Sequence, residues 1–159
     1  MAYTIIDIIN NLIDIEKKGF SIFREISNNS EDLRISIVSK TISNQERKYT
    51  QYYENLKKDI DVLDKEDIDF SIYDRISSRM QQFKISITMP VVTDIKKLIN
   101  FARELSKENL ALLIYIQGQL IRKETDTNML AYNIMGKIIE EQEKYSKSLK
   151  ALYKVVLKY

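Results

Sequence analysis

The sequence predicts an all-α protein: a four-helix bundle in which one long connection joins two antiparallel helical hairpins. Three observations lead to this fold class. The chain has 159 residues, enough for one domain with a buried core, so we expect a single domain over residues 1–159. It contains only three glycines and one proline, which favours long helices with few turns. Apolar residues recur at steps of three and four in four long segments, as on one face of a helix.

The first hairpin is expected to consist of helices over about residues 4–27 and 31–59. Thr4, with Asp7 three residues later, has the pattern of a capping box. A short turn follows the first helix, and Ser30 is the expected N-cap of the second. Because the turn is short, the two helices must be antiparallel neighbours.

The connection is expected to begin in the acidic stretch 59–69 and to contain a short helix over residues 71–84. Helix should be interrupted over residues 85–92, which contain β-branched residues and Pro90. A connection of this length can cross from one end of a bundle to the other.

The second hairpin is expected to begin with Thr93 as N-cap and Asp94 in the first turn of a helix that runs to about residue 122. A turn over residues 123–126 and a last helix over residues 127–157 complete the prediction.

The middle of the apolar seam is polar in all four predicted helices. Residues 46–49 (Glu-Arg-Lys-Tyr) are matched 96 residues later by residues 142–145 (Gln-Glu-Lys-Tyr). Glu16 lies in the seam of the first helix and Ser106 in that of the third. Since residues three apart lie on one face of a helix, both ends of each four-residue motif face the same seam.

Residues 15–23 (Ile-Glu-Lys-Lys-Gly-Phe-Ser-Ile-Phe) and 138–145 (Ile-Ile-Glu-Glu-Gln-Glu-Lys-Tyr) are similar to the first and fourth helices of rubrerythrins. The chain therefore resembles the rubrerythrin-like branch of the ferritin-like superfamily over nearly its whole length. The resemblance implies ferritin-like topology and a site that holds two metal ions, with Glu from two helices and Glu-x-x-His from the other two. Carried over by position, the ligand positions are Glu16, Glu46, Tyr49, Ser106, Gln142 and Tyr145.

These positions do not keep the family's ligands, so the di-iron ligand set is degenerate. Glu16 and Glu46 are the acids that remain, and the chain has no histidine. Neutral tyrosine is a poor ligand because its reference pKa is about 10. We therefore assign no catalytic, cofactor-binding or metal-ligating residue. Instead, we hypothesise that both seam tyrosines donate their hydroxyl groups to the two glutamates, and that Gln142 and Ser106 complete the network. Burial should raise the pKa of such carboxyl groups.

Composition excludes several classes of protein. Without cysteine or histidine, the chain has no disulfide, Fe–S cluster, thiolate zinc site or ordinary catalytic triad. A net charge of +2 gives no case for nucleic acid as a partner. No apolar run reaches the length of a membrane span and no signal peptide is recognisable, so we expect a cytoplasmic protein without a membrane partner. We expect a homodimer, as for many relatives; any other protein partner is unknown.

The predicted function is that of a ferritin-like protein that has lost the di-metal site and has a structural or protein-interaction role, with no cofactor. A non-enzymatic role is favoured. The alternative is a metal-binding oxidoreductase of the di-iron type, or a metal-storage protein, with iron or manganese in a carboxylate-only site. That site would use Glu16 and Glu46 with help from Glu104, Glu108 or Glu143. A helical bundle of another family and a small apolar ligand in the core also stay open.

Overall fold

The structure is a computed structural model that describes residues 3–63, 66–122, 126 and 129–158, the side chains of residues 61–63 excepted. Within these residues the chain forms five helices and no β-strand beyond one isolated bridge. The helices are α1 (Ile5–Asn29), α2 (Leu33–Leu63), α3 (Phe70–Ser86), α4 (Ile95–Gln119) and α5 (Leu130–Lys158). The all-α class that the sequence predicts is confirmed.

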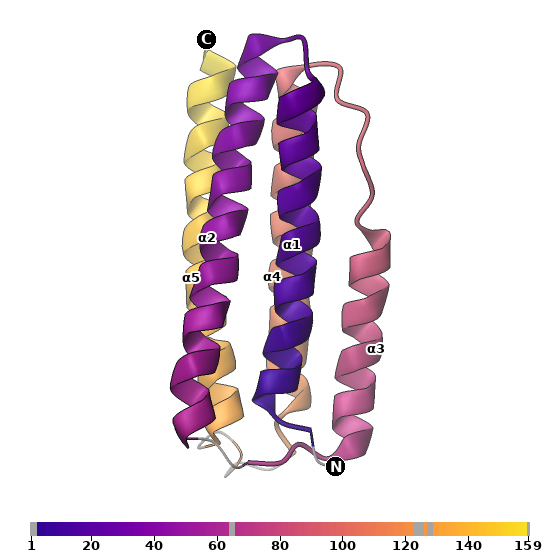
Figure 1. Ribbon diagram of the computed structural model, residues 1–159, viewed down its shortest axis with the longest axis vertical. Coiled ribbons are helices and arrows are strands. Elements are labelled where there is room, and N and C mark those ends of the chain that lie inside the picture. Colours follow the sequence, from indigo (N-terminus) through magenta and orange to yellow (C-terminus); the bar gives the residue numbers. More distant parts are fainter. Residues whose placement is uncertain (1–2, 64–65, 123–125, 127–128, 159) are drawn as a thin grey trace.

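The long helices α1, α2, α4 and α5 lie side by side, and the shorter α3 packs against the outside of α1 and α4 (Figure 1). In that view α1 and α5 run upward, whereas α2 and α4 run downward. Most helix–helix packing occurs within the pairs α1–α2 and α4–α5. The extended segment 87–94 follows α3 upward, so that the chain crosses from the end where α2 finishes to the end where α4 begins.

The start of α1 is capped as the sequence predicts, and the start of α2 is not. Thr4 N–H donates to Asp7 Oδ2 at 2.8 Å, and the Thr4 hydroxyl oxygen accepts from Ile6 N–H, which completes the capping box. The prediction of Ser30 as the N-cap of α2 is wrong. Asp32 takes that place, because its carboxylate accepts from the N–H groups of the two residues that begin the helix after Leu33. Ser30 instead ends α1.

The connection is shorter than predicted because α2 continues through the first part of the acidic stretch, to Leu63. Ile60 is 2% exposed, so an apolar anchor holds this last turn against the core. The predicted short helix is confirmed as α3, with Asp69 as its N-cap. Beside it, Ile68 N–H donates to the carbonyl of Tyr3 at 2.7 Å, which fastens the connection to the start of the chain.

The helix is interrupted after Ser86, as predicted for the segment that contains Pro90. The N-cap of α4 is Asp94 and not Thr93, since the Asp94 carboxylate accepts from Lys97 N–H at 2.9 Å. α4 ends at Gln119, earlier than the predicted residue 122. The start predicted for the last helix, at residue 127, lies outside the described residues.

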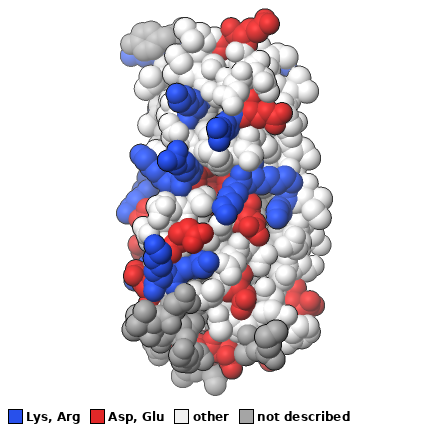
Figure 2. Space-filling view, in the orientation of Figure 1, with Lys and Arg blue, Asp and Glu red and all other residues white. Residues whose placement is uncertain are grey.

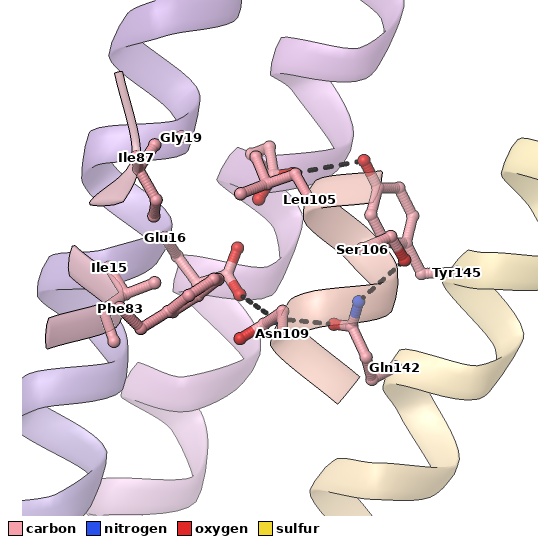
Figure 3. A pocket seen from close by; sticks show the side chains of 11 residues that line it. Ile15, Glu16, Gly19, Phe83, Ile87, Leu105, Ser106, Asn109, Gln142 and Tyr145 are labelled. Carbon is pink, nitrogen blue, oxygen red and sulfur yellow. Dashed lines mark hydrogen bonds between the residues drawn. The ribbon is translucent and has the colours of Figure 1, made fainter. Parts of the chain in front are cut away.

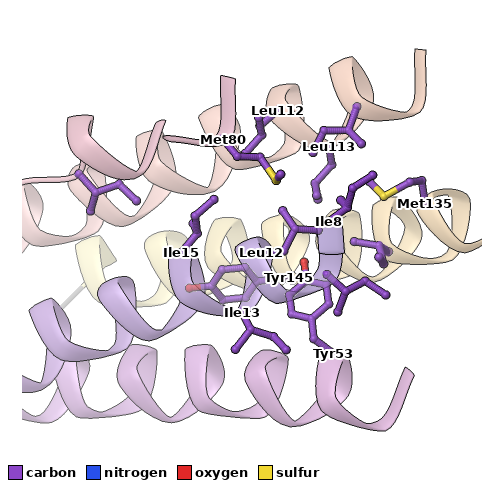
Figure 4. Close-up of a cluster of buried hydrophobic side chains, with 14 of the residues drawn as sticks. Ile8, Leu12, Ile13, Ile15, Tyr53, Met80, Leu112, Leu113, Met135 and Tyr145 are labelled. Atoms are coloured by element: carbon purple, nitrogen blue, oxygen red, sulfur yellow. The ribbon is translucent and has the colours of Figure 1, made fainter. Parts of the chain in front are cut away.

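Each long helix buries a stripe of large aliphatic side chains, part of which Figure 4 shows. Among the largest fully buried side chains are Tyr53 of α2 and Phe23 of α1. α3 adds Ile72, Ile76 and Met80 to the same core. Because one such side chain contributes about 1.5–3 kcal/mol on burial, packing of these stripes holds the helices together. Among the described residues, no helix combines the length and the apolar character needed to cross a membrane.

Candidate functional site

Polar side chains from all four long helices meet half-way along the bundle, at positions where the stripes are otherwise apolar (Figure 3). We call this cluster the polar centre. Each member is between 2% and 6% exposed. An unpaired buried polar group costs several kcal/mol, so the hydrogen-bond partners decide what the cluster can do. The members are Glu16 of α1, Glu46 of α2, Ser106 and Asn109 of α4, and Gln142 and Tyr145 of α5.

The carboxyl groups of Glu16 of α1 and Glu46 of α2 line the same small cavity, and each affects the pKa of the other. Burial raises the pKa of both carboxyl groups, and the charge of Glu46 raises that of Glu16 further. Because two ionised carboxylates in contact would repel each other in a dry interior, we expect the pair to share a proton near neutral pH.

A chain of hydrogen bonds runs from Glu16 across the bundle. The Asn109 amide N–H groups donate to Glu16 Oε1 and to Gln142 Oε1, both at 3.2 Å. Gln142 Nε2 donates to the Ser106 hydroxyl oxygen at 3.1 Å. The Ser106 and Ser146 hydroxyl groups are 2.8 Å apart and close the chain near the surface of the α4–α5 pair. Gln142 is thus bonded through both its amide oxygen and its amide nitrogen, and Asn109 through its amide nitrogen, as a buried network requires.

The hydroxyl group of Tyr145 donates to Glu46 Oε1 at 3.1 Å, as hypothesised from the sequence. Burial first, and then the charge of Glu46, hold the pKa of Tyr145 well above its ordinary value, so this hydroxyl stays a donor. The hypothesis is wrong for Tyr49, whose hydroxyl donates to the backbone carbonyl of Glu141 at 2.7 Å. The Tyr49 side chain is only half-buried, and its ring packs on that of Tyr145 with centroids 5.1 Å apart.

Two members of this region had not been singled out from the sequence. Asn109 is not among the positions taken over from the resemblance, although it bonds both Glu16 and Gln142. Its position three residues after Ser106, on the same buried face, is the signal that would have identified it. Tyr53 is 1% exposed, and the charges of the glutamate pair help to raise its pKa, after burial.

A small cavity of about 20 Å³ lies among these side chains. This volume is enough for about one water molecule. Gly19 forms part of its wall: a Cβ there would stand 3.5 Å from Glu46 Oε2, an ordinary van der Waals distance, so the wall has room for a methyl group. Phe83 and Ile87, from the end of α3 and the segment after it, cover the side between α1 and α4.

The polar centre does not fit the two-metal site of the resembled family. Tyr145 and Asn109 aim hydrogen-bond donors at the oxygens of the glutamate pair, where metal ions would need free lone pairs. In the part of the chain that the structure describes, no three carboxylate, imidazole or thiolate groups cluster to hold a metal ion. The acids expected to help Glu16 and Glu46 in the alternative site are all exposed; these are Glu104, Glu108 and Glu143.

The polar centre can thus hold a proton between two carboxyl groups and lock four helices in one register. Five of the six positions taken over from the resemblance converge there, and Tyr49 lies beside them with its hydroxyl directed elsewhere. Comparison of the chain with protein-family models, with curated proteins and with solved structures finds no match.

Proposed function

We propose that the chain is a rubrerythrin-like member of the ferritin-like superfamily that has lost its di-metal site and has a structural or protein-interaction role. The arrangement of helices supports ferritin-like topology. Two antiparallel pairs, α1–α2 and α4–α5, are joined by a connection that contains α3 and returns along the outside. One crossover between two hairpins is the connectivity of ferritin-like bundles.

One observation carries the proposed loss of metal: the hydrogen bonds that Tyr145 and Asn109 donate to the glutamate pair. Two carboxyl groups that share a proton carry about one negative charge, against roughly four positive charges for two divalent ions. A metal pair would have to expel the proton and break both donor contacts, with no imidazole in the chain to compensate. The network instead provides a rigid centre that fixes helix register.

Metal analysis of the purified protein, after anaerobic loading with Fe²⁺ or Mn²⁺ and desalting, tests this proposal. We expect less than stoichiometric metal and an unchanged melting temperature. Stoichiometric metal that disappears in Glu46→Ala, and not in the exposed control Glu31→Ala, would refute it.

The second candidate is the metal-binding oxidoreductase or storage protein. The convergence of Glu16 and Glu46 on one cavity favours it. Iron or manganese would then be held by these two carboxylates alone, after loss of the shared proton. The same loading experiment separates the two candidates, because only this one predicts that added metal raises the melting temperature.

We also propose that the protein acts as a cytoplasmic homodimer. Large apolar side chains are exposed at the end where α2 begins and α5 finishes: Leu33 is 73% exposed, Ile37 56% and Val155 58%. Arg34 donates to the carbonyl of Val156, which joins the two helix ends into one surface. Light scattering after size exclusion should give a dimer that Leu33→Ser with Ile37→Ser converts to monomer. A wild-type monomer would refute the homodimer.

A further inference from the structure

A groove runs between the exposed edges of α1 and α2, in the half of the molecule where these helices are joined. Its volume is about 570 Å³. We call it the basic groove. Figure 2 shows several Lys and Arg side chains over this part of the α1–α2 face, with Asp and Glu side chains beside them. The groove is lined by Phe20, Arg24, Ser27, Asn28, Ser36, Lys40, Ser43, Asn44 and Arg47.

The charge in the groove is all of one sign. Arg24, Lys40 and Arg47 line it together with no carboxylate, in a protein whose net charge is only +2. Among the described residues, none of the three takes part in an ion pair or a side-chain hydrogen bond. Unpaired like charges close together oppose folding, and a bound anion would relieve that repulsion.

Hydrogen bonds between α1 and α2 form the bottom of the basic groove. The Ser27 hydroxyl donates to the Ser36 carbonyl at 2.8 Å, and the Ser36 hydroxyl donates to the Ser27 carbonyl at 2.7 Å. The Ser43 hydroxyl donates to the carbonyl of Phe20. These serine hydroxyl groups donate to backbone carbonyls of the opposite helix, and the small side chains let the two helices lie close together. The charged and amide side chains at the rim therefore remain as the donors that face outward.

The same contacts set the antiparallel register of α1 and α2 and thereby the spacing of the cations. Ser27 pairs with Ser36 and Phe20 with Ser43, which places Arg24 level with Lys40. Arg47 lies seven residues further along α2, at a rise of about 10 Å. The Arg24 guanidinium lies 5.8 Å from the centre of the Phe20 ring, which holds it at the wall of the groove.

We propose that the basic groove binds an anion that carries two or more phosphate groups. One phosphate group would contact Arg24 and Lys40, and a second would contact Arg47. A single phosphate ion is too small to reach both positions at once. Guanidinium groups bind phosphate through paired hydrogen bonds, and the groove volume lies within the roughly 300–1,000 Å³ of small-molecule sites. The proposal is independent of the lost metal site, because the groove shares no residue with the polar centre.

Isothermal titration with sodium tripolyphosphate, at low and at physiological salt, tests the proposal. We expect one ion bound per chain, with at least about tenfold weaker binding in the double variant Arg24→Gln/Arg47→Gln. Orthophosphate should bind about tenfold more weakly than tripolyphosphate, since it reaches one end only. These side chains are exposed, so circular dichroism should show an unchanged fold. Lys40→Gln provides a second, milder variant.

The α4–α5 pair supplies a matched control. A groove of about 440 Å³ there is lined by Arg103, Lys107 and Lys150, but it also contains Glu104. The double variant Lys107→Gln/Lys150→Gln removes the same charge and should weaken binding less than about twofold. Equal losses in the two double variants, or no saturable binding of tripolyphosphate, would overturn the proposal.

The phosphate groups could belong to a soluble ester or to a lipid headgroup, and a further arm separates these sources. The protein is sedimented with phosphatidylcholine vesicles that contain or lack phosphatidylinositol bisphosphate. Co-sedimentation that tripolyphosphate reverses assigns a lipid headgroup, whereas binding of tripolyphosphate alone assigns a soluble ligand.

Discussion

Replacement of Tyr145 by phenylalanine tests the polar centre most directly, because it removes one donor and leaves the ring in place. The Tyr145 hydroxyl donates to Glu46 Oε1 at 3.1 Å, and the residue is 5% exposed. A hydrogen bond to a charged group contributes about 1.5–3 kcal/mol, and we expect Tyr145→Phe to lower the free energy of unfolding by that amount. The ring keeps its packing against Tyr49, so loss of volume adds little.

Tyr49→Phe is the matched control, since the same atom is removed from the neighbouring ring. The Tyr49 hydroxyl donates to a neutral backbone carbonyl at a half-buried position. A neutral bond of this kind contributes about 0.5–1.5 kcal/mol. The difference between the two variants therefore measures the charge on Glu46 and not the loss of a tyrosine hydroxyl as such.

The pH dependence separates the two variants further. The bond from Tyr145 lowers the pKa of Glu46, against the larger rise caused by burial. It therefore stabilises the ionised carboxylate, and its loss should cost more as the pH rises through the folded-state pKa of Glu46. Tyr49→Phe should cost the same at every pH.

Urea unfolding followed by circular dichroism, repeated from pH 5 to pH 8, gives both quantities. Equal costs for Tyr145→Phe and Tyr49→Phe, or a cost for Tyr145→Phe that does not change with pH, would refute the account of the glutamate pair given above.

Three further predictions follow from the site and the core. The raised pKa values mean that the folded state keeps protons which the unfolded chain releases above about pH 4.3, so wild-type stability should fall as the pH rises from there through the folded pKa values. Glu16→Gln should make the free energy of unfolding depend less on pH, as measured by urea unfolding at several pH values. The same pH dependence in Glu16→Gln and in the wild type would show that the glutamate pair does not hold the proton. Gly19→Ala should raise the free energy of unfolding by about 0.5–1 kcal/mol, because alanine favours the helix and its Cβ would lie at an ordinary 3.5 Å from Glu46 Oε2. Gly118→Ala is the control, since its Cβ would meet nothing and the variant reports helix propensity alone. A loss of stability at Gly19 together with a gain at Gly118 would contradict this geometry. Met80→Ala should cost about 2–5 kcal/mol by thermal or urea unfolding, since this side chain is 0% exposed; a cost below 1 kcal/mol would show that α3 does not hold the core.

The helices themselves could be predicted well from the sequence, because helix formation depends on neighbours within one or two turns. The capping box of Thr4 and Asp7 and the short helix α3 are local patterns and are confirmed. The errors are also local. At the starts of α2 and α4 a serine or threonine was chosen where an aspartate one or two residues later caps the helix. A carboxylate accepts from the first N–H groups and also complements the helix dipole, so it prevails over the nearby hydroxyl.

The sequence predicted where the polar centre lies, but only some of its hydrogen bonds. The seam pattern alone placed Glu16, Glu46, Ser106, Gln142 and Tyr145 on buried faces, and the structure brings them together. It did not distinguish the two tyrosines, which occupy equivalent places in their four-residue motifs. One hydroxyl reaches a carboxylate and the other a backbone carbonyl.

The sequence by itself therefore determined the helices, their apolar faces and the polar interruption in the middle of each face, since all three are written in spacings of three and four residues. Only the tertiary structure decided which donor bonds which acceptor in the polar centre, how Asn109 joins it, and that Arg24 lies level with Lys40. These pairings depend on the register of one helix against another. That register is set by packing between segments far apart in the chain, which no local spacing records.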